Sequence, residues 1–168
     1  AGGNTSFIKN WGKTTGGTDF TVVFAIKLPA SSNGRLFWDG INNSSNNGWG
    51  AQWFPALSNT VDFTQYYSVS STKLFRSSGI SAAAAGDVVL LAVGYNHTTN
   101  TGSIWGNSAT AASTTLALGT TTADPSVTLK LMANGGLGSA NGTEVYGMSS
   151  YNKLLSNAEF AEIAAQYN

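Results

Sequence analysis

The chain has 168 residues, of which only 10% are charged, and its eight basic and eight acidic side chains give a formal net charge of zero. Without a basic excess, binding to a nucleic-acid duplex lacks its main source of affinity. The absence of cysteine excludes disulfides and thiolate metal sites. No stretch approaches the ~20 apolar residues that insertion into a membrane requires. The length suits one domain over 1–168, and the Gly/Thr-rich residues 1–17 fit a leader joined to a larger protein.

The first strand is expected at 20–28. Every second side chain from Phe20 to Leu28 is apolar, which is the period of a strand with one buried face. Pro29 lacks a backbone N–H and ends it. After a turn, further strands are expected at 35–39, 50–54, 61–69 and 73–75. A polar loop rich in Asn and Ser, at 40–48, separates the first two of these strands.

A second strong strand is expected at 87–97. It is apolar on both faces, as in the centre of a sandwich where each side is covered. Residues 81–86 contain four alanines but are closed by Gly86, so we expect a loop rather than a helical turn. The hairpin loop 97–102 leads to the remaining strands, expected at 103–107, 114–118, 127–133 and 144–151. Many short strands with turns between them favour a two-sheet antiparallel sandwich.

The chain ends in a short helix. Ser156 and Glu159 have the spacing of a capping box, in which each side chain binds the other residue's backbone N–H. Leu155 before the cap and Phe160 after it have the spacing of a hydrophobic staple. From Phe160 to Tyr167 the apolar residues repeat at i, i+3, i+4 and i+7, which predicts one apolar face.

Three segments resemble a known family: Gly86–Tyr95, Thr101–Asn107 and the closing helix motif Leu155–Phe160. Together they resemble the central hairpin and the tail of the concanavalin A-like (laminin G-like) jelly-roll superfamily. The sequence departs from that pattern at Gly106-Asn107, which is inverted, and at Val88, which stands near the usual Trp. The resemblance implies an all-β, two-sheet antiparallel jelly-roll sandwich with one short C-terminal helix, and a ligand site on the concave face or the rim loops.

No catalytic site is evident in the sequence. Glycoside hydrolysis needs two facing carboxylates, whereas the acidic residues here are isolated and flank strands or turns. His97, the only histidine, lies in a polar loop, where a surface turn is the simpler reading. Because some relatives in the family bind Ca²⁺ through a loop aspartate and carbonyls, Asp39 with Asn42 and Asn43 is the one metal candidate; no other cofactor is expected.

Aromatic and amide side chains gather in the first half of the chain. Sugars lay their C–H faces on aromatic rings while amides and carboxylates bind their hydroxyls. The candidate ligand-binding residues are Trp38, Asp39, Asn42, Asn43, Trp49, Gln52, Trp53, Tyr66 and Tyr67. An alternative stays open, in which Trp49 and Trp53 are core residues between the sheets.

These observations lead to a functional hypothesis, a non-catalytic carbohydrate-recognition module on a virion or cell surface, with a glycan or polysaccharide as partner. The alternative is a structural module of a larger assembly such as a phage fibre or capsid, with other subunits as partners, because the polar residues are uncharged Ser, Thr, Asn and Gly. A polysaccharide-cleaving enzyme is the third and least supported hypothesis. An extracellular or virion-surface location is expected.

Overall fold

The fold was analysed in a computed structural model. The structure describes residues 17–28, 35–42, 47–54, 60–68, 71–76, 84, 86–115, 130–131 and 144–167. Within these, the backbone alone is described for 35–42, 47–48, 52–54, 65–68, 71–76 and 130–131.

In the part of the chain that is described, ten strands form two antiparallel sheets of five strands each. Sheet A contains, in spatial order, β10 (Glu144–Tyr151), β1 (Phe20–Lys27), β6 (Val88–Asn96), β7 (Thr101–Gly106) and β8 (Ala112–Thr115). Sheet B contains β5 (Ser71–Arg76), β4 (Thr60–Ser68), β3 (Asn47–Phe54), β2 (Arg35–Asn42) and β9 (Lys130–Leu131). The one described helix, α1 (Asn157–Ala164), follows β10.

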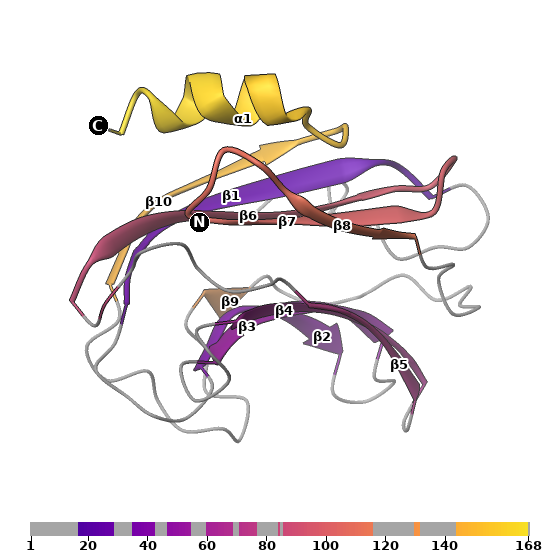
Figure 1. Ribbon diagram of the computed structural model, residues 1–168. Coiled ribbons are helices and arrows are strands. Elements are labelled where there is room, and N and C mark those ends of the chain that lie inside the picture. The colour runs from indigo at the N-terminus through magenta and orange to yellow at the C-terminus, as the bar shows by residue number, and fades with distance from the viewer. Residues whose placement is uncertain are drawn as a thin grey trace.

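The elements stack in three layers, with α1 on the outer face of sheet A and sheet B below it (Figure 1). Sheet B arches, and its hollow side faces away from sheet A. The predicted all-β sandwich with one short C-terminal helix is therefore confirmed. Among the described residues, no helix is long and apolar enough to cross a membrane.

The main core lies between the two sheets. As predicted, the apolar side chains at every second position from Phe20 to Leu28 are buried there. On the facing sheet, Trp49 stacks on Phe63 with ring centroids 4.5 Å apart, and Phe20 meets Trp49 edge-on at 5.3 Å. Burial of several large rings supplies most of the driving force that holds the sheets together.

A second core lies between sheet A and α1. Leu90 and Ala92 face this side of β6, while Val89, Leu91 and Val93 face the other sheet, as the two-sided pattern predicted. Trp105 and Phe160 stack here at 5.3 Å. Both helix-start motifs are confirmed: the capping box is present, and the staple residues are buried.

Thr21 connects the first strand to the segment that enters α1. Its hydroxyl donates to the carbonyl of Lys153 at 2.7 Å and accepts from the N–H of Leu155 at 3.0 Å. The segment passes so close to Gly94 that a Cβ there would lie 2.7 Å from the carbonyl oxygen of Phe20 and 2.8 Å from Leu154. Only glycine fits this contact without displacing backbone.

Some sequence predictions need correction. The polar loop expected at 40–48 is mostly strand, because backbone pairing in the β2–β3 hairpin continues out to Asn42 and Asn47; residues 43–46 lie outside the described residues. Of the strand expected at 127–133, only Lys130–Leu131 is described and it forms β9, so the length of that strand stays a prediction. Residues 1–16 and 81–83 also lie outside the description, so the single domain with a leader stays a prediction.

Candidate functional site

Trp49, one of the predicted ligand-binding residues, is a core residue. Its side chain is only 2% exposed, and it packs against Phe20, Phe63 and Tyr95 between the sheets. The prediction that a ligand reaches this ring is corrected, and the alternative core interpretation holds for Trp49. The alternation of a strand explains it, because position 49 shares the inner face with the buried Ala51.

The other predicted tryptophans, Trp38 and Trp53, lie in neighbouring rows of sheet B, where a row is a set of residues paired across adjacent strands. Residues directly opposite each other in an antiparallel pair share a face of the sheet. Trp38 pairs with Ala51, and Trp53 pairs with Val61, and both partners are buried between the sheets. These two positions therefore fall in the rows of the inner face; their side chains lie outside the described residues.

Three polar candidates fall in the rows of the opposite, hollow face. Asp39 pairs with Gly50, which in turn pairs with Thr64 on β4. Gln52 pairs with Asp62, and Tyr66 follows Thr64 by two positions on the same strand. The backbone thus brings positions 39, 52 and 66 to one face, although their side chains are outside the description.

Two of the last three candidates, Asn42 and Tyr67, lie at the end of the β2–β3 hairpin. Asn42 and Tyr67 both pair with Asn47, so their backbones are adjacent across three strands. Asn43 lies outside the described residues, and only the backbone of Asn42 and Tyr67 is described. Whether this end of the sheet contacts a ligand stays a prediction.

A polar row on β4 was not recognised in the sequence. Thr60, Asp62 and Thr64 alternate with the core residues Val61 and Phe63, and all three are buried although they belong to the hollow face. The hydroxyl of Thr60 has no hydrogen-bond partner in the part of the chain described. Buried polar groups without partners are rare and point to strain or function. The alternation Thr-Val-Asp-Phe-Thr was a signal that could have identified the row.

Several of the described carboxylates outside this row have structural partners. Asp19 accepts from the side chain of Asn96 and the backbone N–H of His97, both at 2.7 Å, so His97 is held in its turn as expected. Asp87 accepts from the N–H of Ala84 at 2.7 Å. Among the residues described, no group of three or more His, Cys, Asp or Glu side chains is arranged to hold a metal. The calcium prediction at Asp39 is not tested, because that side chain is not described.

An ion-paired carboxylate lies at the edge of sheet A. Glu144 accepts from the ammonium of Lys27 and from the hydroxyl of Tyr146, each at 2.9 Å. The bond from Lys27, followed by that from Tyr146, lowers the pKa of Glu144, and the carboxylate in turn raises the pKa of Lys27 and of Tyr146. This trio lies beside a cavity under α1 that the sequence analysis did not predict.

Comparisons with solved structures identify similar folds. The chain is similar to an HCR/D tryptophan-to-alanine mutant, with 13% identity and a TM-score of 0.68 over 89% of this chain. It is also similar to the binding domain of botulinum neurotoxin DC in complex with SialylT, with 16% identity and a TM-score of 0.65 over 90%. A third similar structure, with 13% identity and a TM-score of 0.60 over 90%, concerns botulinum neurotoxin type C, whose cell entry depends on interaction with two ganglioside molecules.

These similarities establish the β-sandwich fold. The chain spans 38%, 36% and 36% of the three matched chains, so it corresponds to little more than a third of each. No protein-family model matches the sequence, and a search of curated proteins finds no relative.

Proposed function

We propose that this protein is a non-catalytic carbohydrate-recognition module that binds a glycan on the hollow face of sheet B. The observation that carries this proposal is the backbone register, which brings the polar positions 39, 52 and 66 to this one face. Sugar recognition requires several hydrogen-bonding groups that converge on one surface.

The backbone register also supports a glycan site on the hollow face of sheet B. Gln52, Asp62 and Arg76 lie side by side across three strands, and Asp39 falls in the next row of the same face. Amide, carboxylate and guanidinium groups are those that bind sugar hydroxyls and acidic sugars. Tyr66 adds a ring position on this face, onto which a C–H face of a pyranose stacks.

The solved structures support a glycan as the ligand class. A neurotoxin domain of similar fold is bound to SialylT, and another belongs to a toxin that interacts with gangliosides. The neurotoxin DC structure is a binding domain, which supports a binding role for this chain rather than catalysis. We further propose, on the resemblance of its hairpin and tail motifs, that the chain belongs to the concanavalin A-like jelly-roll superfamily. An extracellular or virion-surface location is proposed with it.

A structural role in a larger assembly, such as a fibre or capsid, is the second candidate function. Its support is the composition, because only eight basic and eight acidic side chains occur in 168 residues. Other subunits would then be partners, and a stable oligomer is the expected result of analytical ultracentrifugation. A monomer that binds glycan favours the recognition module alone.

The proposal is tested with a glycan array of neutral and sialylated oligosaccharides, followed by calorimetric titration of any glycan that binds. We expect binding, and we expect Gln52→Ala and Tyr66→Ala each to weaken it about tenfold, equivalent to ~1.4 kcal/mol. Tyr146→Ala, which removes an exposed tyrosine from the other sheet, is the matched control and should leave the affinity unchanged. Absence of binding to every glycan, or equal loss in the control, would contradict the proposal.

A further inference from the structure

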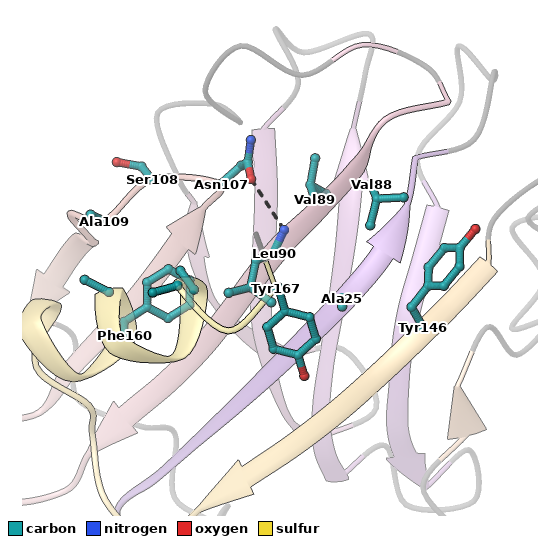
Figure 2. Close-up of a pocket in the computed structure, with 13 residues that line it drawn as sticks. Ala25, Val88, Val89, Leu90, Asn107, Ser108, Ala109, Tyr146, Phe160 and Tyr167 are labelled. Carbon is teal, nitrogen blue, oxygen red and sulfur yellow. Dashed lines mark hydrogen bonds between the residues drawn. The ribbon is translucent and has the colours of Figure 1, made fainter.

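A cavity lies on the outer face of sheet A beside α1, on the side of the molecule opposite the hollow face of sheet B. Its volume is about 560 Å³, within the ~300–1,000 Å³ common for small-molecule sites. Figure 2 shows Ala25 and Leu90 on its strand side, with the rings of Tyr146 and Tyr167 beside them. We call this cavity the helix groove.

Apolar side chains that remain exposed to water in the folded protein are concentrated at the helix groove. Four large apolar side chains are exposed among the described residues, and three of them line it: Val88 at 57%, Tyr146 at 58% and Tyr167 at 50%. Such gathered apolar surface marks binding sites, because covering it recovers ~25 cal/mol per Å². The sequence pattern placed Val88 and Tyr167 on buried faces, and the structure corrects both.

The helix groove is preformed rather than assembled by a ligand. Asn157 at the start of α1 accepts from the indole N–H of Trp105 at 3.1 Å and from the N–H of Ala111 at 3.0 Å, which fixes the helix to sheet A. The ring of Tyr167 lies over Gly147, where a Cβ would be 3.3 Å from the tyrosine oxygen. Walls that are already ordered reduce the entropy lost on binding.

The uncharged side chains that line the helix groove favour an uncharged ligand. None of the described residues that line it carries a formal charge, and the neighbouring Glu144 and Lys27 bind each other at 2.9 Å. A charged ligand would lose hydration here without gaining a counter-ion, which costs free energy. Polar atoms occur at one end, where Asn107 accepts from the N–H of Leu90 at 3.4 Å and Ser108 follows.

We propose that the helix groove binds one small, uncharged molecule with an aromatic or alicyclic ring, held against Tyr146 and Tyr167 with its polar end near Asn107 and Ser108. Two tyrosine rings favour a ring-shaped partner, since stacked or edge-on rings gain ~0.5–1.5 kcal/mol beyond their buried area. A small molecule fits better than a protein segment because the cavity is concave and is lined from several elements rather than flat. This site is independent of the proposed glycan site.

The neutral fluorophore phenylnaphthylamine tests the proposal, with its anionic relative anilinonaphthalene sulfonate as a matched comparison. We expect a saturable, one-to-one increase in phenylnaphthylamine emission, and binding of the sulfonate about tenfold weaker or more, because the lining offers it no cation. No saturable signal from the neutral probe, or equal affinity for the two probes, overturns the proposal.

Variants then locate the bound probe. Tyr146→Ala and Tyr167→Ala should each weaken binding by roughly fivefold to tenfold, and Ala164→Phe should block it by filling the helix groove. Met148→Ala is the matched control, because Met148 is an exposed apolar residue on the same strand as Tyr146 but does not line the groove. Binding that survives all three groove variants, or that falls equally in Met148→Ala, overturns the assignment.

Discussion

Glu159 combines three interactions at the start of α1. The ammonium of Lys153 contacts its carboxylate, and Ser156 donates to it through the backbone N–H at 2.9 Å and through the hydroxyl at 3.0 Å. These bonds, led by that from Lys153, lower the pKa of Glu159 from 4.5 to about 2. The carboxylate is therefore bound more favourably in its charged form when the chain is folded.

This shift predicts a pH-dependent contribution to stability. Because the folded-state pKa is lowered, the contribution is present above the unfolded value of 4.5 and is lost as the pH falls toward about 2. Glu159→Gln keeps a capping side chain but removes the charge. We expect it to lower the melting temperature at about neutral pH, and the difference from the wild type to shrink through this range.

Thermal unfolding followed by circular dichroism across that pH range measures the effect. Glu162→Gln, an exposed substitution on the same helix, is the matched control, and it should change stability by no more than ~0.5 kcal/mol at about neutral pH. A difference between wild type and Glu159→Gln that stays constant from about pH 7 to about pH 2 contradicts the account.

Short local motifs could be identified from the sequence. Which face of sheet B is buried at the tryptophans could not. Ser156 and Glu159 are three residues apart, so their interaction is determined by helix geometry alone. Trp49 and Trp53 were consistent both with a ligand site and with the core, because alternation places them on one face without saying which face is buried. Only the packing of β4 and β1 against Trp49 decides this for Trp49.

At the scale of elements, α1 is held to sheet A by side chains that are distant in sequence. Asn157 accepts hydrogen bonds from Trp105 and Ala111, and Phe160 stacks on the indole of Trp105. The position of the helix and the inward face of Phe160, Ile163 and Ala164 were predictable from its caps and period, whereas Tyr167 lies beyond α1 and is half exposed. Its partner residues were not, because a contact between residues 52 positions apart leaves no periodic trace.

Loss of this anchor should destabilise the protein. Asn157→Ala leaves the N–H of the 1% exposed Trp105 without its acceptor, which should cost about 1–3 kcal/mol in urea unfolding. In a Trp105→Phe background the donor is absent, so the same substitution should cost about 1 kcal/mol less. Equal costs in the two backgrounds would show that Asn157 acts through the helix start rather than through the indole.

At the scale of the whole molecule, the two outer surfaces differ in chemistry. The hollow face of sheet B carries the polar row of β4, whereas the outer face of sheet A carries α1 and the uncharged helix groove. The sequence predicted the two sheets because strand periodicity is local. It did not predict the groove, because β1, β6, β10 and α1 contribute to it together and only the folded chain brings them into contact.

The central claim, that a glycan binds the hollow face of sheet B, is tested most directly by nuclear magnetic resonance. Isotope-labelled protein is titrated with an oligosaccharide selected on the array, and the amides whose signals shift are mapped. The account predicts that the shifts cluster on β3 and β4, around Gln52 and Thr60 to Tyr66. Shifts confined to α1 and the start of β6, or no shifts at saturating sugar, would contradict it.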